Sequence, residues 1–189
     1  MAHRSNHPIM TMALLISLSW SVGITTLTAQ DVQRNEMLET INARQQTSWK
    51  TAKQIWNWAE PGYQETKSSA LLIKILRAQG FHIESEVAGI PTAFTATFGK
   101  GKPIIGMLGE YDALPGLSQQ ATPQRAQPED KSNGYGHGCG HHLLGVASME
   151  GAIAIAQQIK AGNLQGTIRY YGCPAEEGGS AKVFMVNAG

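Results

Sequence analysis

Residues 141–172 read HHLLGVASMEGAIAIAQQIKAGNLQGTIRYYG, and this stretch predicts a helix that leads into a strand. The helix is expected over 141–160, because its apolar pattern is continuous until Gly162 closes it. The strand is expected over 166–172. Upstream, residues 103–112 (PIIGMLGEYD) form an apolar run that ends in charge. Such a run predicts a buried strand that delivers side chains from its carboxyl end.

Two further helices and two further strands are expected before this unit, and another helix is expected after it. Their expected ranges are 31–59, 66–80, 81–89, 92–99 and 180–189. Residues 115–135 are rich in Pro, Gln, Asp and Ser, and they predict a long loop. Because helices alternate with strands, the sequence predicts an α/β fold, a three-layer sheet with flanking helices.

The size and charge of the chain narrow the function classes. It has 189 residues and a formal net charge of +1, which suits one domain and gives no electrostatic case for binding nucleic acid. Residues 1–29 carry Arg4, then the uncharged run MALLISLSWSVGITTLT, then the small residue Ala29. This layout predicts a signal peptide over 1–29 and export to the periplasm or outside the cell. If the start is misassigned, the protein is expected in the cytoplasm.

Three clusters of reactive side chains stand where an α/β fold places its sites, at strand ends and helix starts. They are GEYDALPG at 109–116, HGCGHH at 137–142 and PAEEGG at 174–179. The first cluster ends a strand, the second starts a helix, and the third follows a strand. The three clusters converge if the sheet brings those strand ends and the helix start together.

In the second cluster, Cys139 and His141 flank a single glycine. Thiolate and imidazole both bind zinc-like ions, and glycine lets the backbone turn tightly between them. A helix N-terminus is also expected to lower the pKa of the thiol. The cluster alone leaves other hypotheses open: a turn with incidental histidines, a disulfide to Cys173, or a thiol nucleophile with His137 or His141 as its base.

The pair Glu176–Glu177 favours a metal hydrolase. Adjacent glutamates are usually a solvated surface, but these follow an apolar strand and a proline. One carboxylate can bind a metal while the other takes a proton from the attacking water. A thiol enzyme would leave both glutamates without a role.

In this order, GEYDALPG, GHGCGHHLLG and GTIRYYGCPAEEGGSAK resemble the two-metal amidohydrolases. That family includes aminoacylases, hippurate hydrolases, auxin-conjugate hydrolases and aminobenzoyl-glutamate hydrolases. The motif sequences found here are most similar to those of the last group. The resemblance spans residues 35–189. It implies a catalytic domain like that of the zinc exopeptidases, two divalent metal ions (zinc or manganese), and an N-acyl or N-aroyl amino acid as the small-molecule substrate.

The resemblance also implies roles for individual residues. Cys139, His141 and Glu177 match the family's metal ligands, and Glu176 matches its general base. Asp112 matches the acid that supports the site without gripping a metal. The resemblance leaves the roles of three other residues open: Glu110, His137 and His142.

Members of this family are much longer, with further histidine ligands and a second domain through which they dimerise. The resemblance therefore implies that residues 31–189 form the N-terminal portion of a catalytic domain, which is incomplete and inactive alone. Two alternatives stay open: an inactive exported metal-binding relic, and a metallopeptidase that acts on short peptides.

Overall fold

The computed structural model describes residues 28–124, 126 and 133–189. The predicted signal peptide therefore lies outside the described residues, apart from its last two positions. Thr28 caps the first helix, α1 (Ala29–Trp58), through a reciprocal pair of hydrogen bonds with Asp31. Among the described residues, no helix is both long enough and apolar enough to span a bilayer.

The protein has a mixed four-stranded sheet with strand order β1-β2-β6-β3. The strands are β1 (His82–Ser85), β2 (Phe94–Lys100), β3 (Ile104–Gly109) and β6 (Gly166–Gly172). β1, β2 and β6 pair antiparallel in turn, whereas β3 and β6 run parallel. The parallel pair is joined by a crossover through α3 (His141–Lys160), as an α/β unit requires.

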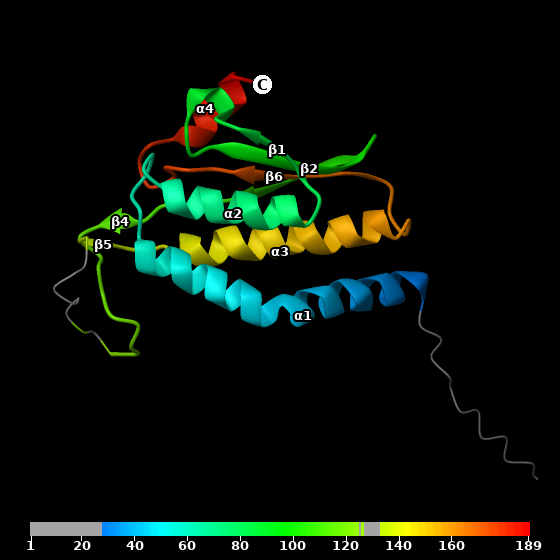
Figure 1. Cartoon of the computed structure of the whole chain (residues 1–189), viewed down its shortest axis with the longest axis horizontal. Helices are drawn as coiled ribbons and strands as arrows, with labels where there is room; N and C mark the ends of the chain where they lie inside the picture. The colour runs from blue at the N-terminus through cyan, green and yellow to red at the C-terminus, as the bar shows by residue number, and fades with distance from the viewer. Residues whose placement is uncertain (1–27, 125, 127–132) are drawn as a thin grey trace, which may run out of the picture.

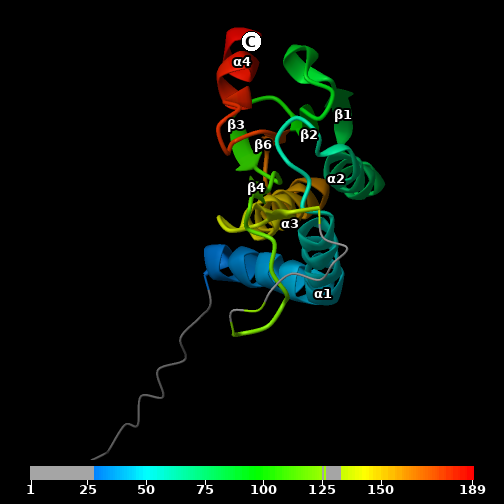
Figure 2. The same ribbon diagram turned by 90° about the vertical axis from the view of Figure 1, so that its left-hand side faces the viewer.

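Three of the helices form two layers beneath the sheet (Figure 1). α2 (Thr66–Ala78) and α3 lie against one face of the strands, and α1 crosses α3 on its outer side, as the view turned by 90° also shows (Figure 2). Arg44 of α1 donates two hydrogen bonds to Glu150 of α3, at 2.5 and 3.0 Å, and so ties the outer layer to the inner one. The predicted α/β fold, a sheet flanked by helices, is confirmed.

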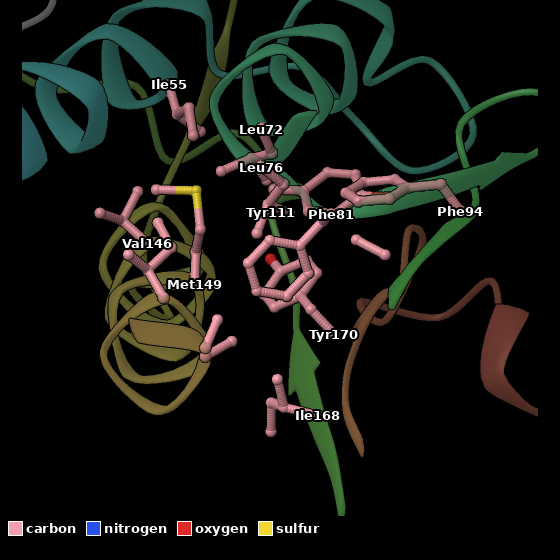
Figure 3. Packing of buried hydrophobic residues seen from close by; sticks show 14 of the residues in the cluster. Ile55, Leu72, Leu76, Phe81, Phe94, Tyr111, Val146, Met149, Ile168 and Tyr170 are labelled. Carbon is pink, nitrogen blue, oxygen red and sulfur yellow. The ribbon is translucent and has the colours of Figure 1, made fainter. Parts of the chain in front are cut away.

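The core lies between the sheet and the α2–α3 layer. Side chains from α1, α2, α3 and the central strands meet there with no exposed surface, including Ile55, Leu72, Met149, Ile168 and Tyr170 (Figure 3). Burying one such side chain contributes about 1.5–3 kcal/mol. The predicted helix at 141–160 is therefore apolar on most sides because it packs between the sheet and α1.

β3 is not the buried strand that the run PIIGMLG predicts. It is an edge strand, paired on one side with β6. Three of its large side chains, Ile104, Ile105 and Leu108, are 52–55% exposed. An apolar run predicts a strand, but the number of neighbouring strands decides how deeply it is buried.

The remaining elements are short. β4 (Leu114–Pro115) and β5 (Tyr135–Gly136) pair antiparallel and close the base of the predicted loop, parts of which lie outside the described residues. A 3-10 turn, η1 (Val87–Gly89), follows β1. The last helix, α4 (Ala181–Asn187), follows β6 and packs near η1 at the top of Figure 1.

Candidate metal centre

The carboxyl ends of β3 and β6 meet at one edge of the sheet. Gly109 pairs with Gly172 as the last position of both strands, and the Cys173 N–H donates to the Gly109 carbonyl at 2.8 Å. α3 approaches this edge closely, since a Cβ on Gly145 would lie 2.3 Å from the carbonyl oxygen of Glu110. The segments that follow each strand and the start of α3 therefore converge.

His141 lies at the centre of this edge and is almost fully buried, with 1% exposure. Its Nδ1 lies 2.8 Å from Asp112 Oδ1, so Nδ1 donates to that carboxylate. Its Nε2 faces three other carboxylates: Glu110 Oε2 at 3.1 Å, Glu176 Oε2 at 3.6 Å and Glu177 Oε1 at 3.9 Å. The ring is thus oriented by one acid and surrounded by three.

Two sets of potential metal ligands share this histidine. Cys139, His141 and Glu177 form one, and Glu110, His141 and Glu176 form the other; within each set the ligand atoms lie within 4.8 Å of one another. A thiol, an imidazole and a carboxylate suit zinc, and the carboxylate-rich set suits manganese as well. The donor chemistry therefore fits a divalent ion.

The two sets are not two independent sites. Nδ1 of His141 is engaged by Asp112, which leaves Nε2 as the single ring atom with a lone pair for a metal. One ion at a time can use it. A second ion needs at least one ligand from elsewhere in addition to the carboxylates near His141.

Asp112 joins the strand-end segments. Its Oδ1 accepts from His141, and its Oδ2 accepts from the Glu177 backbone N–H at 2.8 Å. Burial favours the neutral acid, but these two hydrogen bonds outweigh it and lower the pKa of Asp112 below its usual value. Burial likewise disfavours the charged form of His141, but the bond to Asp112 and the nearby carboxylates outweigh burial and raise its pKa.

Cys139 is exposed, and its pKa is raised. The prediction that the helix N-terminus lowers this pKa is therefore wrong. Loss of solvation and the negative charges of Glu177, Glu176 and Glu110 all raise it. Carboxylates contributed by other segments therefore outweigh the N-terminus of α3. A thiol with a raised pKa makes a poor unaided nucleophile, so the cluster disfavours thiol catalysis and suits a cation instead.

The second cysteine takes no part in a disulfide. Cys139 and Cys173 are both free thiols, and Cys173 is buried with 1% exposure directly after β6. Burial raises the pKa of Cys173 to about 11.

The histidines with open roles lie beside the centre. His137 Nε2 donates to the Ile55 carbonyl at 3.2 Å, which ties the site loop to α1. The ring of His142 packs against that of His137, with centroids 4.9 Å apart. Burial lowers the pKa of His137 to about 4, with a smaller contribution from His142.

The sequence did not single out two charged side chains near the site. Lys182 of α4 forms an ion pair with Glu110, which is the nearest carboxylate to His141 Nε2. Glu65, at the start of α2, is completely buried and accepts from the Ala175 N–H at 2.8 Å. Lys182 ends the motif at 166–182 that contains both glutamates, but its pairing with Glu110 requires the folded chain, and Glu65 belongs to none of the three motifs.

The motifs and the fold both have known relatives. No family model matches the chain. Over 152 residues it is 48% identical to a component of the p-aminobenzoyl-glutamate hydrolase of Escherichia coli (strain K12), a match that covers 80% of this chain and 31% of that protein. The chain is a homologue of the aminobenzoyl-glutamate hydrolases. The resemblance drawn from the three motifs is confirmed.

The chain also resembles peptidases. It is 30% identical over 152 residues to the Xaa-Arg dipeptidase of Mus musculus, covering 73% of this chain and 31% of that one. It shares its fold with the Bacillus subtilis YXEP protein, a dinuclear metal binding peptidase of the M20 family. The TM-score is 0.61 at 23% identity, over 82% of this chain and 40% of that one. The chain thus spans about a third of the length of the curated relatives it matches.

Proposed function

We propose that this chain contributes the metal-binding edge of a metal-dependent amidohydrolase that cleaves N-acyl or N-aroyl amino acids, with aminobenzoyl-glutamate as the leading substrate. The observation that carries the proposal is the convergence of Cys139, His141 and Glu177 ligand atoms within 4.8 Å. The 48% identity to the Escherichia coli p-aminobenzoyl-glutamate hydrolase component supports the substrate class.

In this proposal Cys139, His141 and Glu177 hold one of two divalent ions, zinc or manganese. When bound, such an ion polarises the amide carbonyl and makes water more acidic. Asp112 keeps the His141 ring in the orientation and tautomer that present Nε2, because it accepts from Nδ1.

Glu176 is the general base in this scheme. It is the most exposed of the carboxylates around His141, at 39%, so it can reach both water and substrate. Its carboxylate takes a proton from the attacking water as the new C–O bond forms. It then delivers that proton to the leaving nitrogen as the amide C–N bond breaks, so the products are an amine and a carboxylic acid, which loses the second proton of the water to solvent.

The adjacent glutamates provide the decisive pair of variants in the full-length protein. Glu176→Gln is expected to lower the rate of aminobenzoate release by about 10²–10⁴-fold while zinc or manganese binding stays unchanged. Glu177→Gln is expected to weaken metal binding itself, measured by titration calorimetry. The proposal fails if the wild-type protein binds no divalent metal at stoichiometric levels, or if Glu176→Gln turns over normally. Metal binding without hydrolysis of any acyl-amino acid or peptide would favour the inactive-relic alternative.

A second candidate substrate class is a short peptide. The 30% identity to the Xaa-Arg dipeptidase favours it. Comparing kcat/KM for aminobenzoyl-glutamate with that for dipeptides ending in arginine separates the two. A higher value for the dipeptides would replace the aroyl substrate and leave the assignment of the metal site intact.

Export is a separate part of the proposal and rests on residues 1–29 alone. N-terminal sequencing of the protein recovered from the periplasm or medium is expected to begin near residue 30. Recovery of the intact N-terminus from the cytoplasm would contradict export.

A further inference from the structure

The segment 60–66, which joins α1 to α2, lies against the chain just beyond β3. Its Glu60 carbonyl accepts from the Ala113 N–H at 2.9 Å, and Pro61 forms a parallel β-bridge with the same residue. Ala113 directly follows Asp112. The segment therefore supports the loop that carries the acid behind His141.

The same segment packs against the turn at 174–179, which carries both site glutamates. A Cβ on Gly62 would lie 2.9 Å from Ala175 Cα, so the two backbones touch. The Tyr63 hydroxyl donates to the Gly179 carbonyl at the far end of the turn. One short segment thus contacts the loops beyond both strands.

Glu65 is the charged member of this contact. Its side chain is completely buried at the N-cap position of α2, where a polar side chain often accepts hydrogen bonds from the first turn of the helix. It makes no capping bond to α2. Instead, Oε1 accepts from the Ala175 N–H at 2.8 Å and Oε2 accepts from the Thr92 hydroxyl at 2.9 Å.

Glu60 performs the capping that Glu65 does not. Its carboxylate accepts from the backbone N–H groups of Lys67 and Ser68 at 3.0 and 2.9 Å. The two acids are both buried and stand five residues apart, but one stabilises a helix start and the other reaches the metal turn. Burying a carboxylate is costly unless it is hydrogen-bonded. Because Glu65 does not cap α2, its burial must be explained by the groups that it does contact.

The explanation lies in the backbone of Ala175, which has φ of 50°. A left-handed conformation costs a non-glycine residue about 1–2 kcal/mol, so it persists where neighbours hold it. Glu65 holds the Ala175 N–H, and Asp112 holds the Glu177 N–H at 2.8 Å. Glu176 lies between these two fixed points.

We propose that Glu65 is a positioning residue, which holds Ala175 in its left-handed conformation through the Ala175 N–H and so directs Glu176 and Glu177 toward His141. The role depends on the reach of the carboxylate and not on its charge. It rests on the proposed function only in that Glu177 is taken as a metal ligand.

Two substitutions separate reach from charge. Glu65→Gln keeps an acceptor oxygen at the same length, whereas Glu65→Asp keeps the charge but is too short to reach the Ala175 N–H. In the full-length protein, Glu65→Asp is expected to lower cobalt affinity about 10–100-fold, as loss of a group that orients a ligand does. Glu65→Gln is expected to stay within about threefold of wild type.

Glu60→Asp and Glu60→Gln are the matched controls. They are expected to lower the urea midpoint through loss of helix capping, with cobalt affinity within about twofold of wild type. The inference is overturned if Glu65→Asp binds cobalt like wild type, if Glu65→Gln loses as much as Glu65→Asp, or if the Glu60 variants lose affinity equally.

Amide hydrogen exchange provides a readout that needs no metal. The Ala175 amide is expected to exchange at least about tenfold faster in Glu65→Asp and at the wild-type rate in Glu60→Asp. If wild type binds no cobalt, the proposed function fails and this exchange rate alone decides the positioning role. Unchanged exchange at Ala175 in Glu65→Asp overturns that role.

Discussion

β3 and β6 lie side by side and run in the same direction, but the more apolar strand is the more exposed. β6 contains Thr167 and Arg169, yet it lies between two neighbours and most of it is buried. β3 reads IIGMLG, yet its outer edge is open and most of it is exposed. The strands differ along their lengths and become equivalent at their carboxyl ends, where each delivers acids to His141. The position of a strand in the sheet thus determines how deeply its side chains are buried. The shared direction of the two strands determines that their carboxyl ends meet at the metal site.

The largest expected effect comes from two isoleucines that face each other across this pair. Ile105 and Ile168 are register partners, but Ile105 is 52% exposed and Ile168 is fully buried. Ile168→Ala is expected to lower the free energy of unfolding by about 2–5 kcal/mol, because it leaves a cavity. Ile105→Ala is expected to cost less than about 1 kcal/mol. Equal losses in urea denaturation would show that the edge of β3 is covered in solution.

The next effect tests whether the strand ends are equivalent. Asp112, beyond β3, bonds both His141 and the backbone of Glu177, beyond β6. Asp112→Asn keeps the shape but replaces one acceptor oxygen with a donor, and it is expected to weaken zinc affinity about 10–100-fold by calorimetry. Glu84→Gln, on β1, is the control and is expected to bind zinc normally. If Asp112→Asn matches that control, Asp112 does not orient His141 for the metal.

A pH titration tests the third segment at this edge, which carries His137. The pKa of His137 is lowered from 6.5 to about 4, chiefly by burial. Between these values the unfolded chain binds more protons, so this contribution to stability is present above pH 6.5 and is lost as the pH falls toward 4.

The loss is expected to be on the order of 3 kcal/mol, because each unit of pKa shift corresponds to about 1.4 kcal/mol. It is measured by urea denaturation of metal-free protein at a series of pH values. His137→Phe should flatten the pH dependence over this interval. A variant whose stability falls as steeply as that of wild type would place the titration elsewhere.

The smallest effect concerns Lys182, which pairs with Glu110 just beyond β3. Lys182→Met removes a positive charge near the ligands and is expected to raise zinc affinity severalfold, by about 1 kcal/mol. Stability should change little, since the pair is partly exposed. Weaker zinc binding would instead mean that Lys182 holds Glu110 in place for the metal.

The sequence predicted the features that are determined by residues close together along the chain. The helix at 141–160, the strand at 166–172 and the clustering of Cys139 with His141 follow from local pattern, and the carboxyl ends of parallel strands meet by geometry alone. Side-chain burial in β3 could not be predicted in this way, because it depends on how many strands adjoin it.

Interactions between charged residues from distant segments could not be predicted from the sequence either. The thiol pKa of Cys139 was predicted to fall because Cys139 stands near a helix start. Loss of solvation raises it instead, together with the charges of Glu177 and Glu110, which follow β6 and β3. Glu65 lies 110 residues from Ala175 in sequence, and no periodicity connects them. The metal ligands and Asp112, which orients His141, were predictable because they occur in motifs, whereas Glu65 was not.

The parallel pairing of β3 and β6 has a consequence for the order of folding. The pair closes through a crossover that contains all of α3, and contacts between residues so distant in sequence form late and slowly. Cys139 and His141 are neighbours from the outset, but Glu177 joins them once β6 has docked. A metal ion can therefore consolidate this domain after its sheet is assembled, but it cannot template the nascent chain as zinc does in a finger whose ligands are all local.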